Sequence, residues 1–220
     1  KSMPPHEFAR EFLSWWDDPG ADAVFGPGAW DYTATDYPDP MDFQPEALGV
    51  AVAIDQKSSA IVGCGFRIID DHQIPAVKVL AAGPGEGWLV ETASRFSGEL
   101  RAPVVMAKDG PASHLVESMK KACRGRFKTP TFPQYLDSCA ELYVAVSSGN
   151  FQHGDQSELN EAVANAEKLD KGDRWVWRRR GAVDISPLEA CTLALWGASH
   201  WQRSAADERM QDGGPAVMSV

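Results

Sequence analysis

Residues 48–69 read LGVAVAIDQKSSAIVGCGFRII and contain two apolar runs joined by a short polar segment. The first run, 48–55, is almost wholly apolar and ends in Asp55, which is typical of a buried strand. The second run, 60–69, and a third at 76–82 follow after short connections. These three runs predict an antiparallel meander of three strands at the start of a sheet.

Helical and strand-like patterns alternate after the meander. Residues 87–100 and 112–123 have the apolar spacing of helices, and a short buried strand at 102–107 lies between them. The same periodicities predict further elements: a brief strand at 127–129, helices at 6–16, 135–148, 159–168 and 186–201, and a strand at 174–178. A meander followed by such crossovers predicts an α/β fold, with a mixed central sheet and helices on both faces. This is the element order of the RNase H-like fold, and other α/β folds stay open at this point.

The chain of 220 residues is 44% hydrophobic and 24% charged, which is a globular composition and excludes disordered and fibrous classes. We expect an acidic lead-in at 1–47, rich in Pro, Gly and Asp, then one domain at 48–203 and a flexible tail at 204–220. No apolar run reaches the roughly 18 residues of a membrane span, so no membrane partner is expected. Four widely spaced cysteines without a C-x-x-C pair favour core positions in a reducing cytoplasm.

The net charge of −10 argues at first against a nucleic-acid partner. However, residues 1–50 contain ten acidic and two basic side chains, a net of −8, so the remainder carries only −2. Two basic segments there are interpreted either as a surface that follows a phosphate backbone or as ordinary solvated surface. Their residues are Lys120, Lys121, Arg124, Arg126 and Lys128 in the first, and Arg174, Arg178, Arg179 and Arg180, interleaved with Trp175 and Trp177, in the second.

Three aspartates lie at the ends of predicted elements. Asp55 ends the first strand, Asp109 follows the strand after the meander, and Asp184 precedes the last helix. Each alone is an ordinary turn former, but adjacent parallel strands bring their carboxyl ends to one edge of a sheet. Three clustered carboxylates require a cation, and hard oxygen ligands select Mg²⁺ or Mn²⁺. Two such ions ~3.5–4 Å apart can activate a water and stabilise the leaving oxygen of a phosphodiester.

Motifs for other chemistries are missing from the sequence. Residues 83–87 (GPGEG) lack the Lys-Ser/Thr ending of a phosphate-binding P-loop, which excludes an ATPase site within this chain. No serine lies in a G-x-S-x-G elbow, and the five histidines have no zinc-ligand spacing.

Residues 172–197 read GDRWVWRRRGAVDISPLEACTLALWG. This stretch closely resembles the run GD-x-W-x-W-x-R followed by DISPL-x-A-x-x-LALWG in the C-terminal nuclease domain of tailed-phage terminase large subunits, particularly of phages that infect actinobacteria. Residues 50–55 and 104–112 resemble two further motifs of that domain, and the similarity runs from about residue 48 to 200. The family's VVVD-P motif reads VVMAKDG here, so its acid is displaced by a residue or two, to Asp109.

The resemblance implies an RNase H-like endodeoxyribonuclease that cuts concatemeric double-stranded viral DNA during packaging, in the host cell cytoplasm. Asp55 would bridge two Mg²⁺ or Mn²⁺ ions, with Asp109 and Asp184 each holding one. The lead-in would follow a packaging ATPase domain, and the full-length protein would contact the portal protein and the small terminase subunit. A Holliday-junction resolvase or RNase H-type nuclease stays open, as does a noncatalytic DNA-clamp module in which the aspartates are structural.

Overall fold

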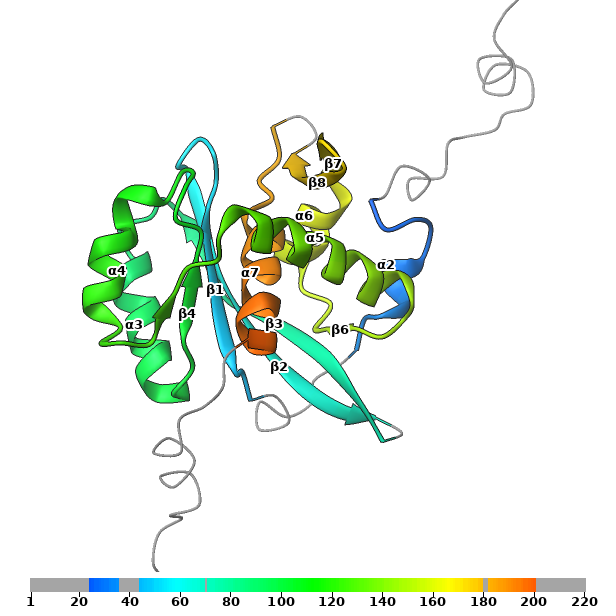
Figure 1. Ribbon diagram of the computed structural model, residues 1–220, viewed down its shortest axis with the longest axis horizontal. Coiled ribbons are helices and arrows are strands. Elements are labelled where there is room, and N and C mark those ends of the chain that lie inside the picture. Colours follow the sequence, from blue (N-terminus) through cyan, green and yellow to red (C-terminus); the bar gives the residue numbers. More distant parts are fainter. Residues whose placement is uncertain (1–23, 36–43, 70, 180–181, 201–220) are drawn as a thin grey trace, which may run out of the picture.

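Figure 1 shows a computed structural model in which helices cover both faces of a central sheet. The structure describes residues 24–35, 44–69, 71–179 and 182–200. The predicted helix at 6–16 and the tail at 204–220 lie outside these described residues. Within the described part of the chain, no helix has the length and apolar character needed to cross a membrane.

The central sheet has six strands in the order β5-β4-β1-β2-β3-β6. The strands are β1 (Ala47–Val52), β2 (Ser58–Ile69), β3 (His72–Pro84), β4 (Val104–Met106), β5 (Phe127–Lys128) and β6 (Gln152–His153). The first three form the predicted antiparallel meander. β4 pairs in parallel with β1, β5 with β4, and β6 with β3. The predicted mixed sheet is therefore confirmed.

Each face of the sheet carries its own layer of helices. One layer holds α3 (Leu89–Leu100), α4 (Val116–Ala122) and the 3₁₀ turn η2 (Ser113–Leu115), and the other holds α2 (Ala29–Tyr32), α5 (Phe132–Ser147), α6 (Ser157–Ala164) and α7 (Ser186–His200). Alternate residues of β1 serve the two layers: Leu48 and Val50 pack toward α3, and Ala47 and Ala51 pack toward α7. All four cysteines are buried and free, which confirms their predicted place in the core.

The helix α7 lies directly on β1. Between residues 186 and 198 every residue of this helix except Glu189 is buried. A Cβ atom added at Gly49 of β1 would lie 1.8 Å from the Ala190 carbonyl oxygen, and one at Gly197 would lie 2.5 Å from Cγ2 of Val105. Gly49 therefore allows the backbones of β1 and α7 to approach without a side chain between them, and Gly197 makes room for the Val105 side chain of β4.

A second, two-stranded sheet lies next to α7 and corrects one prediction. The helix expected at 159–168 ends at Ala164, and β7 (Ala166–Lys171) pairs with β8 (Arg174–Arg179) as an antiparallel hairpin. Gly172 closes the turn at a φ of 73°, a conformation that favours glycine. Trp177 of β8 is buried and donates a hydrogen bond from Nε1 to the Thr192 hydroxyl over 2.8 Å. This contact fixes the hairpin to α7 and accounts for the switch from helix to strand.

Residues 24–35 of the predicted lead-in pack into the helical layer that contains α5 and α6. Phe25 and Trp30 are buried and stack with ring centroids 5.5 Å apart, and Trp30 also stacks on His153 at 3.9 Å. Thr33 and Thr35 bond to the backbone of His153, so this segment runs along β6. The described part of the lead-in thus contributes to the hydrophobic core.

We predict that Gly49→Ala lowers the free energy of unfolding by about 3 kcal/mol, because the new methyl group overlaps the α7 backbone. Urea denaturation measures this change. Gly98→Ala is the matched control: Gly98 lies in α3 with no atom within 4 Å of the added Cβ, so this change should stabilise the protein by about 0.5–1 kcal/mol. Equal stability of Gly49→Ala and wild type would contradict the close approach.

Candidate functional site

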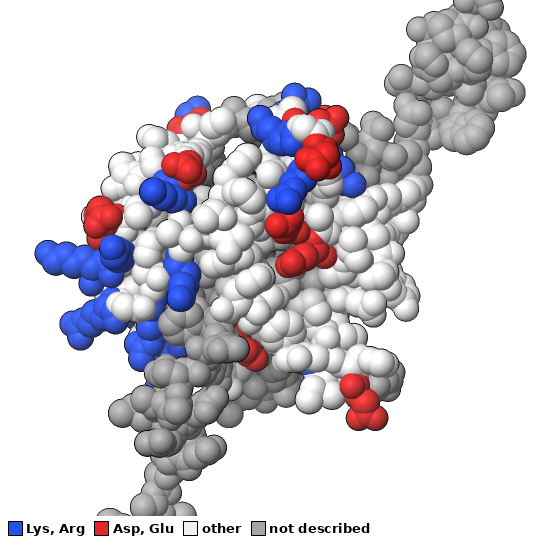
Figure 2. Space-filling view, in the orientation of Figure 1, with Lys and Arg blue, Asp and Glu red and all other residues white. Residues whose placement is uncertain are grey.

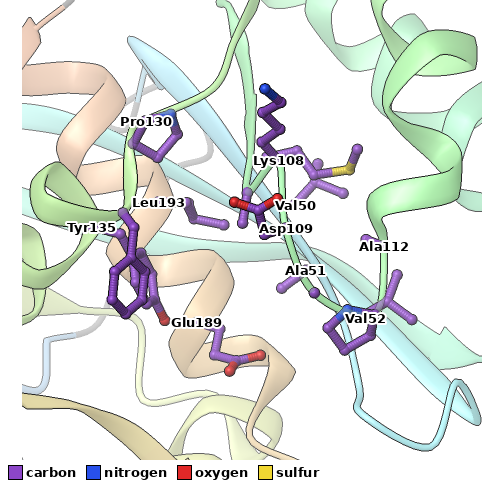
Figure 3. A pocket seen from close by; sticks show the side chains of 15 residues that line it. Val50, Ala51, Val52, Lys108, Asp109, Ala112, Pro130, Tyr135, Glu189 and Leu193 are labelled. Atoms are coloured by element: carbon purple, nitrogen blue, oxygen red, sulfur yellow. The ribbon is translucent and has the colours of Figure 1, made fainter. Parts of the chain in front are cut away.

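A cavity of ≈ 320 Å³ lies at the carboxyl ends of the parallel strands β1 and β4 (Figure 3). Its walls are residues 50–52 of β1, residues 106–112 after β4, the amino-terminal part of α5, and Glu189 and Leu193 of α7. Ligands of open α/β sheets bind at this kind of edge, which makes the cavity the candidate site.

Two carboxylates line the cavity. Asp109 is exposed on the loop after β4, and Glu189 is partly buried on α7. Figure 3 shows Asp109 on the loop after β4 and Glu189 on α7, with the Glu189 carboxylate turned away from Asp109. Lys108, beside Asp109, adds a positive charge to the lining. Asp109 was expected from the sequence, whereas Glu189 was not, although it is the only acidic residue in the stretch 185–198.

The surroundings of Glu189 disfavour its charged form. Burial raises the pKa of Glu189 to about 7, and the nearby charge of Asp184 adds to this shift. Burial also raises the pKa of Tyr135, which lines the same cavity, and the Glu189 charge adds to it. A cation in the cavity would reverse this preference and favour the ionised carboxylate.

Asp184 has a local structural role at the start of α7. Its Oδ1 accepts a hydrogen bond from the Ser186 backbone N–H over 2.7 Å. Its Oδ2 accepts from the hydroxyls of Ser58 and Ser186, over 2.7 and 2.8 Å. These bonds join the beginning of β2 to the beginning of α7. Asp184 lines a second hollow, together with Glu158 and Glu161, rather than the cavity at β1 and β4.

Asp55 lies in the turn between β1 and β2. The strand ends at Val52, so the Asp55 carboxylate belongs to the exposed turn and does not line the cavity. Its Oδ1 accepts a hydrogen bond from the Lys57 backbone N–H over 3.2 Å, as a turn-forming aspartate does.

The three predicted aspartates therefore do not form one cluster. Among the described residues, no group of three or more His, Cys, Asp and Glu side chains is placed to hold a metal ion. Strands β1 and β4 end before their acids, so the donor set does not fit the expected two-ion centre. The lining does offer the carboxylates of Asp109 and Glu189, and a hydrated Mg²⁺ or Mn²⁺ needs only one or two protein carboxylates beside its waters.

The two basic segments differ in their surroundings. In the first segment, Lys120, Lys121, Arg124 and Lys128 are exposed and Arg126 is half-buried. Figure 2 shows Lys and Arg gathered at the edge of the molecule where α4 lies, and mixed charges over the β7–β8 hairpin. In that hairpin, Arg178 forms an ion pair with Glu167 at 2.6 Å.

Arg174, which opens β8, is likewise paired with an acid, Asp137 of α5, at 3.1 Å. The second segment is therefore partly neutralised. The side chain of Arg179 and the whole of Arg180 lie outside the part that the structure describes.

Comparisons with known proteins identify the fold. No family model and no curated protein matches the sequence. The large terminase nuclease from thermophilic phage G20c, solved with bound magnesium, is similar at a TM-score of 0.56 and 14% identity, over 82% of this chain and 98% of that one. The Thermus phage P74-26 large terminase nuclease domain gives a TM-score of 0.50 and 14% identity, over 78% and 93%.

The HK97 bacteriophage large terminase is a third similar structure, at a TM-score of 0.51 and 13% identity, over 77% of this chain and 42% of the HK97 chain. At these identities the likeness establishes the fold. The chain has the RNase H-like fold of large terminase nuclease domains, as the sequence resemblance implied.

We predict that Glu189→Gln stabilises the metal-free protein, increasingly so as pH rises from 5 to 8. The native pKa of about 7 exceeds the ordinary value of 4.5, so the contribution of Glu189 to stability is greatest below pH 4.5 and falls until pH passes 7. The glutamine removes this fall and should gain up to about 3 kcal/mol at pH 8. Urea denaturation in EDTA measures the difference, with pH 5 as the internal control. A difference that does not change with pH would contradict the environment described for Glu189.

Proposed function

We propose that this chain is the nuclease domain of a tailed-phage large terminase subunit and cleaves double-stranded DNA with the help of a divalent metal ion. The observation that carries the proposal is the cavity at the ends of β1 and β4, which both Asp109 and Glu189 line. The fold shared with the G20c nuclease, a protein with bound magnesium, supports the same assignment.

Asp109 and Glu189 would hold the ion, which supplies a polarised phosphodiester and an activated water when bound. Lys108 lies on the same wall as Asp109 and is placed to attract a phosphate. Ala51, Ala107 and Leu193 give the remaining wall an apolar character that excludes water. Tyr135 is close enough to Glu189 for the carboxylate charge to raise the tyrosine pKa, so its hydroxyl keeps its proton.

The basic segment at 120–128 would contact the DNA backbone. Its exposed side chains lie on the last turn of α4, the turn that follows and β5. Phosphate contacts position a protein without reading bases, so we expect little sequence preference and a steep dependence on salt. Arg178 contributes less to this contact, because its guanidinium is already paired with Glu167.

A second candidate is a noncatalytic DNA-clamp module on the same fold. Its support is specific: the described residues contain no three-carboxylate metal group, and both oxygens of Asp184 already accept hydrogen bonds. In either case the full-length protein would carry a packaging ATPase domain and act with the portal protein and the small terminase subunit in the host cytoplasm.

We predict that the purified chain nicks or linearises plasmid in Mn²⁺ and that EDTA stops it. Asp109→Asn and Glu189→Gln should each slow cleavage on the order of 100-fold. Asp71→Asn is the matched control, since Asp71 is exposed in the β2–β3 turn at a φ of 62°, where asparagine is well tolerated. Gel electrophoresis of supercoiled plasmid gives the rates.

Comparing duplex DNA, branched DNA and RNA–DNA hybrids separates a terminase-type activity from a resolvase or an RNase H. If only Asp55→Asn and Asp184→Asn abolish cleavage, the ligands expected from the sequence are correct and the cavity pair is wrong. Tight duplex binding without cleavage would establish the clamp.

We predict that the double variant Lys120→Ala/Lys121→Ala weakens duplex binding equally for unrelated sequences. The logarithm of the binding constant falls linearly with the logarithm of the salt concentration, and each lost phosphate contact makes this slope shallower by about 0.9. The slope of the double variant should therefore be shallower by nearly two. Fluorescence anisotropy of labelled duplexes between low and moderate salt measures both quantities. Lys78→Ala on β3 is the control and should leave the slope unchanged. An unchanged slope in the double variant would contradict the prediction that α4 contacts the DNA backbone.

A further inference from the structure

We infer that the cavity of this chain binds one divalent ion and lacks the second metal site of a two-ion centre. The reason is that alanines occupy the strand positions that face the cavity. The inference rests on the proposed function and concerns the number of ions that the same cavity can bind.

The register of β1 and β4 identifies these positions. Gly49 lies opposite Val105 in the parallel pair, and both face α7: Gly49 abuts the Ala190 backbone and Val105 contacts the Gly197 position. Two residues further along each strand, on the same face, are Ala51 and Ala107. Both line the cavity, so the carboxyl ends of the two central strands direct methyl groups into it.

The strands continue this pattern beyond their last paired residues. Ala53 follows Ala51 at the next alternate position and is only 4% exposed. Ala107 follows Met106, the last residue of β4, and the nearest acid after the strand is Asp109, two residues further on. The carboxylates that reach the cavity come instead from outside the strands, Asp109 from the following loop and Glu189 from α7.

The charge of the cavity matches one ion. Asp109 and Glu189 supply two negative charges when ionised, and Lys108 supplies one positive charge. Two dications ~4 Å apart repel strongly and need bridging carboxylates between them. The lining offers two carboxylates in all, one on each wall, so a second dication would lack both ligands and compensating charge.

The neighbouring acids are engaged elsewhere. Asp184 accepts three hydrogen bonds from Ser58 and Ser186 through its two oxygens. Asp55 lies in the exposed β1–β2 turn, where it accepts from the Lys57 backbone. Neither supplies the missing ligand in this arrangement, so cleavage by the natural chain is expected to be slow and to increase when strand carboxylates are added.

The test counts Mn²⁺ ions bound per full-length chain, by isothermal titration calorimetry and by electron paramagnetic resonance of the free ion. We expect one ion for wild type and two for the double variants Ala51→Asp/Ala107→Asp or Ala53→Asp/Ala107→Asp. Ala140→Asp, which adds one carboxylate at an exposed position of α5 away from the cavity, is the control and should bind one ion. Plasmid nicking in Mn²⁺ should rise at least 10-fold in a double variant that binds two ions.

Thermal melting shows whether each variant is folded. The added carboxylates should lower the melting temperature in EDTA, and Mn²⁺ should raise it by more in the double variants than in wild type. The single variant Ala107→Asp, at a half-buried position, should bind its one ion at least 10-fold more tightly even if the double variants do not fold.

Two ions bound by wild type, none bound by wild type, or folded double variants that still bind only one would each overturn the inference. One ion bound by wild type without any cleavage of DNA would leave the inference intact and reject the proposed nuclease function.

Discussion

The direct contact between the backbones of α7 and β1 is the constraint on which the rest of the structure depends. Gly49 leaves no side chain between strand and helix, and an added Cβ would reach the Ala190 carbonyl. With α7 held this close, Glu189 lies at the edge of the sheet and lines the cavity. The same helix carries Thr192, which anchors Trp177 and with it the β7–β8 hairpin. Position of the site and attachment of the second sheet are therefore consequences of one packing contact.

The charge distribution fits the proposed function only for a domain to which DNA is delivered, since a near-neutral domain has little power to capture DNA from solution. Most of the net negative charge belongs to residues 1–50, and the remaining chain is close to neutral. The basic side chains along α4 form one edge of the molecule (Figure 2), whereas Arg174 and Arg178 of β8 are paired with acids. A single basic edge gives modest affinity at physiological salt. Under the proposed function, such a domain would depend on another part of the packaging machinery to hold the substrate against it.

The sequence was sufficient for the sheet and insufficient for the site, for physical reasons. The meander and the last helix were predictable because their apolar runs are long. The helix expected at 159–168 was wrong from residue 165 onward. There the chain forms β7, which pairs with β8, the strand that carries the buried Trp177. Asp55 and Asp109 were expected at strand ends, but β1 and β4 end earlier, and no periodicity fixes an end to within two residues. Glu189 acquires its importance only from the tertiary position of α7.

The segment that runs beside β6 determines how the sheet terminates. β6 has two residues and is the last strand on its side, and an uncovered strand there would present unpaired backbone groups to other molecules. Thr33 and Thr35 occupy the hydrogen-bonding groups of His153, and Trp30 covers the imidazole ring. Residues 30–35 thus cover this edge and disfavour edge-to-edge association of copies of the protein. A shortened chain that begins at β1 would expose this strand and gain a route to aggregation that the longer chain lacks.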